Sequence, residues 1–97
     1  MTPEGKVKER VKKLLKAHGA YWHMPVQNGM GKPSLDFVGC HDGFFFGVEA
    51  KAGNKGPTPR QEGTMKEMQE AGGVTFLVNE EVGLTALEFW LTCKEKV

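Results

Sequence analysis

The stretch Leu35–Lys51, with the sequence LDFVGCHDGFFFGVEAK, decides the fold. It contains two mainly apolar runs, Leu35–Cys40 and Phe44–Lys51, with Asp-Gly in the His41–Gly43 segment between them. Two apolar runs joined by Asp-Gly are typical of a β-hairpin, because these residues tolerate the backbone conformation of a tight turn. The stretch therefore predicts two antiparallel strands.

Capping signals on either side of the hairpin predict helices. Thr2-Pro3 is a favoured helix start, and Thr58 with Gln61 three residues later has the spacing of a capping box. The expected elements are a helix over 2–17, an extended segment over 21–25, the two hairpin strands, a helix that begins at 58 and ends at 72–73, a strand over 74–78 and a helix over 83–94. This order predicts an α/β fold in which helices pack against a mixed sheet.

Length and composition are those of one globular domain over residues 1–97. The chain has 97 residues, 39% hydrophobic and 26% charged, which excludes a disordered chain and a collagen-like repeat. No apolar run approaches the roughly 20 residues of a membrane helix, and the polar start is unlike a signal peptide. The two cysteines, Cys40 and Cys93, form no CxxC motif. We therefore expect a cytoplasmic protein with no membrane partner.

The charges are distributed unevenly along the chain. Residues 1–60 contain ten Lys and Arg against five Asp and Glu, whereas residues 61–97 contain three against seven, within a total net charge of +1. A basic half favours an anionic partner, with nucleic acid as the first candidate. A solvated helix face explains the same pattern equally well, so charge alone does not choose between the two.

Opposite charges share one face of the second hairpin strand. Side chains alternate along a strand, so Val48 and Ala50 point to one face while Glu49 and Lys51 point to the other. In a central strand, such charges are costly to bury unless they are paired or bind a metal. In an edge strand the same pair is simply solvated, and the spacing leaves both possibilities open.

Asp36 lies in the first hairpin strand, among apolar neighbours. Pairing of the two strands can bring its carboxylate close to Glu49. Two carboxylates and a backbone carbonyl suit Mg²⁺ or Mn²⁺. Lys51 beside them can orient a water molecule and stabilise negative charge on a phosphate. These residue types therefore favour metal-assisted hydrolysis of phosphodiesters.

Asp36 followed by Glu49-Ala50-Lys51, with an early Glu in the preceding helix and a Pro-x-Gln start to the next, resembles the PD-(D/E)XK nuclease superfamily. More narrowly, the chain resembles the virus-type replication-repair nuclease (VRR-NUC) domain in its short stand-alone phage form. The resemblance covers roughly residues 2–78 and rests on the order, spacing and flanking helices of these motifs. It departs from the family pattern at Leu35, where the family motif has Pro.

The resemblance implies a restriction-endonuclease-like αβββαβ core, here followed by a C-terminal helix, and a Mg²⁺- or Mn²⁺-dependent endodeoxyribonuclease. It assigns the metal to the carboxylates of Asp36 and Glu49 and to the carbonyl of Ala50. Lys51 takes the role of the water-orienting catalytic lysine, and Gln61 matches a glutamine near the active site. The capping box provides a second explanation for Gln61.

The family also implies a glutamate of the first helix close to the metal, for which Glu4 and Glu9 are the candidates. At about 100° per residue, Glu4 falls near Val7 and Val11, on the face turned toward the sheet, and Glu9 points roughly the opposite way. We therefore expect Glu4 to belong to the site. A carboxylate at a helix start is also favoured by the helix dipole alone, which is the alternative for Glu4.

Three basic residues, Lys32, Lys55 and Arg60, flank the expected site and are candidates for contacts with DNA phosphates. Plain surface charge is the alternative for each. Stand-alone family members are implied to act as homodimers, and the aromatic run Phe44–Phe46 with Trp90 offers surface for a subunit interface.

Two active sites related by a twofold axis suit paired cuts in a four-way junction. We therefore expect an endonuclease that acts on branched DNA such as Holliday junctions, in the host cytoplasm if a phage encodes it. The alternatives are a catalytically silent nucleic-acid-binding module of the same fold and a nicking or flap-type nuclease.

Overall fold

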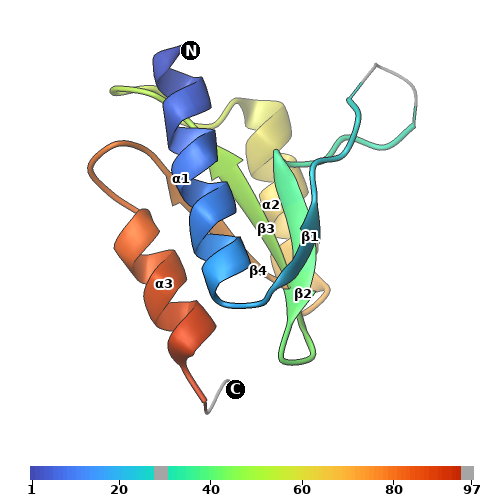
Figure 1. Ribbon diagram of the computed structural model, residues 1–97. Coiled ribbons are helices and arrows are strands. Elements are labelled where there is room, and N and C mark those ends of the chain that lie inside the picture. Colours follow the sequence, from blue (N-terminus) through green and yellow to red (C-terminus); the bar gives the residue numbers. More distant parts are fainter. Residues whose placement is uncertain (28–30, 95–97) are drawn as a thin grey trace.

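The computed structural model describes residues 1–27 and 31–94, and the elements in this part of the chain follow the predicted order. They are α1 (Pro3–Ala17), β1 (Tyr21–His23), β2 (Phe37–His41), β3 (Phe44–Ala50), α2 (Pro59–Glu70), β4 (Val74–Val78) and α3 (Leu84–Thr92) (Figure 1). The strands form a mixed sheet in the order β1-β2-β3-β4, in which β3 and β4 are parallel and the other neighbours antiparallel. The predicted α/β class, with helices flanking a mixed sheet, is confirmed.

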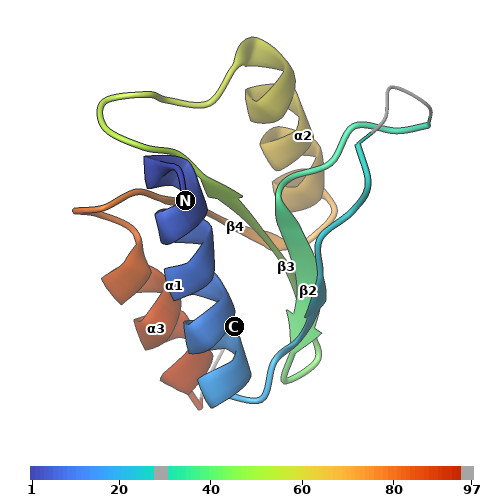
Figure 2. The same ribbon diagram turned by 45° about the horizontal axis from the view of Figure 1, so that its top comes forward.

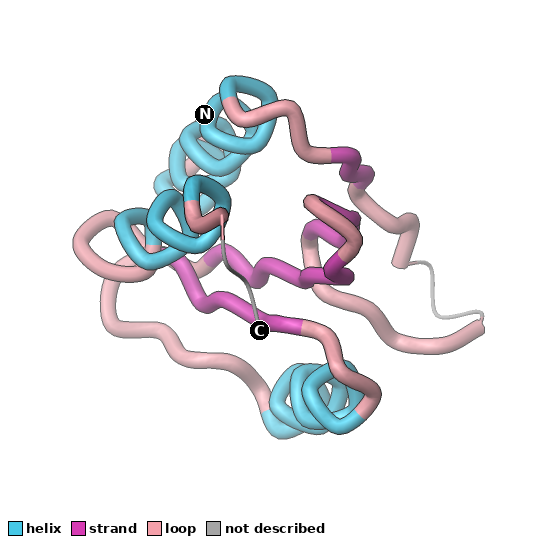
Figure 3. Tube along the Cα trace, turned by 90° about the horizontal axis from the view of Figure 1, so that it is seen from below, coloured by secondary structure: helices cyan, strands magenta, loops and turns pink. Residues whose placement is uncertain are grey.

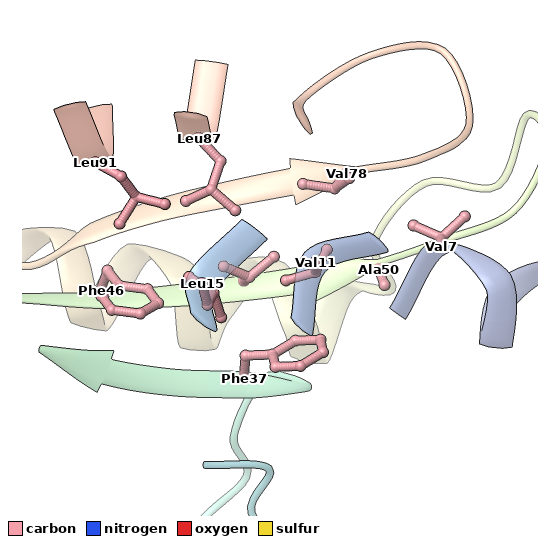
Figure 4. Packing of buried hydrophobic residues seen from close by; sticks show 10 residues of the cluster. Val7, Val11, Leu15, Phe37, Phe46, Ala50, Val78, Leu87 and Leu91 are labelled. Carbon is pink, nitrogen blue, oxygen red and sulfur yellow. The ribbon is translucent and has the colours of Figure 1, made fainter. Parts of the chain in front are cut away.

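Helices cover both faces of the sheet. α1 and α3 lie side by side on one face, and α2 lies on the other (Figures 2 and 3). The core between the helix pair and the sheet contains Val7, Val11, Leu15, Phe37, Phe46, Val48, Ala50, Val78, Leu87 and Leu91 (Figure 4). The α1 members recur every four residues, as on one face of an amphipathic helix, which is why α1 docks in one orientation.

β2 starts later than the sequence predicts, at Phe37 instead of Leu35. The backbone N–H of Asp36 donates to the side chain of Glu49 (3.2 Å), so regular strand pairing begins only after Asp36. Asp36 therefore lies just before the strand. The sequence predicts instead that it lies inside the strand. β3 likewise ends one residue earlier than predicted, at Ala50.

The turn of the hairpin is shorter than predicted. His41 pairs with Phe44, which leaves Asp42 and Gly43 as the turn residues. Their φ angles of 52° and 85° are both positive, as the two-residue turn that matches the twist of a hairpin requires. The turn fixes the register and thereby places the start of β2 beside the end of β3.

β3 lies between β2 and β4, so it is a central strand and the edge-strand alternative for Glu49 is wrong. The aromatic run is divided between the faces of this strand. Phe46 is buried and packs against Trp90, with 5.6 Å between ring centroids, whereas Phe45 is exposed. Trp90 therefore contributes to packing within the molecule, and Phe45 is the most exposed ring of the run.

Across the described residues, no helix combines the length and apolar character needed to cross a membrane.

Candidate active site

Charged side chains gather at one end of the sheet, where β2 begins and β3 ends. The N-terminal ends of α1 and α2 lie at this same end, which is uppermost in Figure 1. Residues from four separate segments meet there. Asp36 comes from the chain before β2, Glu49 from β3, Gln61 from the first turn of α2 and Lys8 from α1.

Two backbone hydrogen bonds hold Asp36 and Glu49 together. The N–H of Asp36 donates to Oε1 of Glu49 (3.2 Å), and the N–H of Ala50 donates to Oδ2 of Asp36 (2.9 Å). Each carboxylate is thus fixed by the backbone of the opposite segment. Glu49 is 2% exposed, whereas the side chain of Asp36 is 14% exposed. The pair therefore has one deeply buried member and one member at the surface of the site.

The charge of Glu49 is costly in this position. The pKa of Glu49 is raised from 4.5 to about 7, first by burial and then by the negative charge of Asp36, while Lys51 acts in the opposite direction. Desolvation and a like charge both disfavour ionisation of a carboxyl group. A cation held between these two carboxylates would favour the ionised form.

Lys51 is placed by the β3–β4 pairing. Its backbone N–H donates to the carbonyl of Val78 (2.9 Å), which continues the parallel pairing one residue beyond β3. Its Nζ lies 3.5 Å from Oε2 of Glu49, and the side chain is largely buried. The predicted placement of Glu49 and Lys51 on a shared face is confirmed by this contact.

Gln61 uses both ends of its side-chain amide. Its Nε2 donates to Oε2 of Glu49 (2.7 Å), while its Oε1 accepts from the backbone N–H of Thr58 (2.9 Å). The hydroxyl of Thr58 accepts in return from the N–H of Gln61 (3.2 Å), which completes the capping box. The capping explanation is confirmed, and the contact with Glu49 exists beside it.

The two candidate glutamates of α1 have different surroundings. Glu4 pairs with Lys8, whose Nζ lies 3.6 Å from Oε2 of Glu4 and 3.7 Å from Oδ1 of Asp36. Glu9 pairs instead with Lys12 (3.1 Å). Glu4 is therefore joined to the carboxylate pair through Lys8. Lys8 was missed by the sequence reasoning, although its spacing of four residues from Glu4 is that of a helical ion pair.

The three basic candidates have different surroundings. Lys32 and Arg60 line a polar cleft of about 240 Å³ together with Gln61. The ammonium of Lys32 already pairs with Glu67 (2.7 Å). Lys55 is exposed in the loop between β3 and α2. Arg60 directly precedes Gln61, which donates a hydrogen bond to Glu49.

The donor set at Asp36 and Glu49 fits a hard divalent cation. Within residues 1–27 and 31–94, no group of three or more His, Cys, Asp or Glu side chains is arranged to hold a metal ion. Mg²⁺ is commonly bound through one or two carboxylates and keeps several water molecules, so it does not need a third acidic side chain. Asp36 and Glu49 supply two carboxylates, and Ala50 supplies a backbone carbonyl next to Glu49 in the sequence.

No protein-family model matches this chain, and no match to it is found among curated proteins. The chemistry of the residues that meet at the end of the sheet is therefore the basis for a function. They combine two adjacent carboxylates, an ammonium group beside them and an amide that orients one of them.

Proposed function

We propose that this protein is a divalent-metal-dependent endonuclease of the VRR-NUC type, which hydrolyses phosphodiester bonds in branched DNA such as Holliday junctions. One observation carries the proposal. Asp36 and Glu49 are tied together by hydrogen bonds to backbone N–H groups, and the Lys51 ammonium lies 3.5 Å from Glu49. These groups suit metal-assisted hydrolysis of phosphodiesters, because two carboxylates can hold the ion and an ammonium can stabilise charge on the phosphate.

Asp36 and Glu49 would hold Mg²⁺ or Mn²⁺ through their carboxylates, with the carbonyl of Ala50 as a further oxygen ligand. When bound, the ion supplies Lewis-acid polarisation of a phosphoryl oxygen. Lys51 orients the attacking water and stabilises the negative charge that develops on the phosphate. Gln61 keeps Glu49 in one orientation through its hydrogen bond of 2.7 Å.

The raised pKa of Glu49 supports a cation at this position. A pKa of about 7 shows that the buried carboxyl group of Glu49 is poorly compensated beside a second carboxylate, even with the Lys51 ammonium 3.5 Å away. Such a pair costs folding free energy unless a cation compensates it. Glu4, joined to Asp36 through Lys8, adds a further carboxylate at the edge of the site.

Basic residues beside the site support DNA as the substrate. Arg60 and Lys32 line the cleft next to Gln61, and Lys55 lies in the loop after β3. Contacts of this kind hold the phosphate backbone in register without reading its sequence. A homodimer of this small chain would present two active sites, which suits paired cuts in a four-way junction.

The test compares linear, flapped and four-way DNA in Mg²⁺, Mn²⁺ or EDTA. We expect the four-way junction to be cut in either metal and not in EDTA. Asp36→Asn should abolish cutting, whereas Asp42→Asn, the same change in the hairpin turn, should preserve it.

Binding of all substrates without cleavage would identify a silent binding module. Cleavage restricted to flapped or nicked strands would identify a nicking or flap-type nuclease instead of an enzyme that resolves junctions. The mass of the protein in solution tests the homodimer.

A further inference from the structure

Lys8 bridges two carboxylates at the edge of the candidate site. Its Nζ lies 3.7 Å from Oδ1 of Asp36 and 3.6 Å from Oε2 of Glu4. Both distances exceed those of a direct hydrogen bond, so the ammonium is held by the charge of both groups and is not locked onto either. The side chain is 29% exposed, so the protein does not enclose it. Lys8 is therefore attracted to the site and is able to leave it.

The two oxygens of Asp36 have different surroundings. Oδ2 accepts the N–H of Ala50 at 2.9 Å. Oδ1 accepts no hydrogen bond from the described residues and has the ammonium of Lys8 beside it. The oxygen that is not engaged by the backbone is thus the one that a tethered cation already approaches.

We infer that Lys8 acts as a built-in competitor of the divalent cation: its ammonium compensates Asp36 and Glu4 when the ion is absent and lowers the affinity of the site for the ion. This inference rests on the proposed metal site at Asp36 and Glu49. Two cations cannot share the same oxygen without mutual repulsion, so binding of the ion requires Lys8 to withdraw. Lys8 is in this sense a positioning residue that tunes metal binding.

The experiment measures Mn²⁺ binding by isothermal titration calorimetry on the full chain, at fixed ionic strength. Lys8→Met retains a long apolar side chain and removes the charge. We expect it to bind Mn²⁺ about fivefold more tightly than the wild type, the scale of two partly exposed ion pairs. Thermal unfolding of the metal-free proteins gives a second readout. Metal-free Lys8→Met should unfold at a lower temperature than the wild type. Mn²⁺ should raise the unfolding temperature of Lys8→Met more than that of the wild type.

Lys12→Met is the matched control. Lys12 lies one turn further along α1, has a similar exposure of 35% and pairs with a glutamate of the same helix, Glu9. It undergoes the same change of charge without a contact to Asp36 or Glu4 in the structure. Its affinity for Mn²⁺ should stay within about twofold of the wild type. Lys8→Gln serves as a second variant if Lys8→Met does not fold.

Each outcome decides the inference. Tighter binding by Lys8→Met alone, including binding that the wild type lacks, supports it. Equal or weaker binding by Lys8→Met, or equal tightening by Lys12→Met, overturns it and leaves the metal site in place. Absence of Mn²⁺ binding in all variants overturns both the inference and the proposed metal site. Mn²⁺ binding with the expected tightening but without DNA cleavage removes the proposed activity and leaves the inference standing.

Discussion

The side-chain amide of Gln61 donates a hydrogen bond of 2.7 Å to Glu49, while its oxygen accepts from the backbone of Thr58 at 2.9 Å. One side chain thereby caps α2 and orients a buried carboxylate of β3. The two functions are coupled, because a shift of the first turn of α2 would carry the donor away from Glu49.

Because Gln61 contacts Glu49 and Thr58 does not, two substitutions that both damage the cap should have different effects. Thr58→Ala should cost about 1 kcal/mol of folding free energy, the usual value of a lost N-cap, and Gln61→Ala should also destabilise the helix because it removes the reciprocal bond of the capping box. Only Gln61→Ala removes a donor to Glu49, so it should also lower the cleavage rate by about tenfold, as the loss of a hydrogen bond to a metal ligand does. Thermal unfolding and single-turnover cleavage measure the two effects. Equal cleavage rates in both variants would leave Gln61 as a helix cap and nothing more.

Asp36→Asn should abolish cleavage and leave DNA binding largely intact. The substitution keeps an oxygen that can accept the N–H of Ala50, so the local structure should survive while the charge needed for a divalent ion is lost. Binding is measured in Ca²⁺, and cleavage in Mg²⁺. Cleavage at the wild-type rate would contradict the metal assignment.

Lys51→Ala should lower the turnover rate by roughly 10²-fold, on the scale of losing one preorganised donor. Substrate affinity should change little, because we expect other basic residues to contact the phosphates. Lys51→Arg should also fail, since a planar guanidinium does not replace a compact ammonium 3.5 Å from Glu49. Single-turnover cleavage of a labelled junction, with binding measured in parallel, separates the two effects. Weak binding combined with a normal rate at saturation would make Lys51 a binding residue.

The stability of the metal-free protein should fall as the pH rises from about 5 to 7. The pKa of Glu49 is raised from 4.5 to about 7, mainly by burial and then by the charge of Asp36. Between these values the folded state binds more protons than the unfolded chain, so unfolding becomes easier with rising pH and the effect ends above the folded pKa. At 1.4 kcal/mol per pKa unit, the total is about 3 kcal/mol.

Glu49→Gln is the control for this pH dependence, because it cannot ionise. The free energy of unfolding is measured with urea at several pH values. In Glu49→Gln it should decrease much less between pH 5 and 7 than it does in the wild type. The affinity of the wild type for Mn²⁺ should rise over the same range, since the metal takes the ionised carboxylate. An unchanged pH profile in Glu49→Gln would assign the titration to another group.

Binding of DNA should weaken steeply as salt is added, because phosphate contacts release counterions. Lys55→Ala and Arg60→Ala should each reduce the slope of log affinity against log salt by about one unit. Lys32→Ala should reduce it less, since Glu67 already pairs with Lys32 at 2.7 Å. Fluorescence anisotropy over a salt series in Ca²⁺ measures the slopes. Unchanged slopes for Lys55 and Arg60 would reduce both to plain surface charge.

The sequence alone determined the features that depend on neighbours along the chain. The Asp-Gly pair between two apolar runs predicts the hairpin, Thr58 and Gln61 form a capping box, and strand alternation puts Glu49 and Lys51 on a common face. These are consequences of local backbone conformation and of the two-residue repeat of a strand, so residues a few positions apart are enough to predict them.

Only the tertiary structure decided which distant groups meet. Strand order made β3 central and so buried Glu49, and the docking of α1 on the sheet brought Lys8 between Glu4 and Asp36. The N–H of Asp36 also donates to the side chain of Glu49 and not to the backbone of a neighbouring strand, so β2 is shorter than predicted. Such contacts depend on how elements far apart in the chain pack together, and the spacing of residues within one element carries no information about that packing.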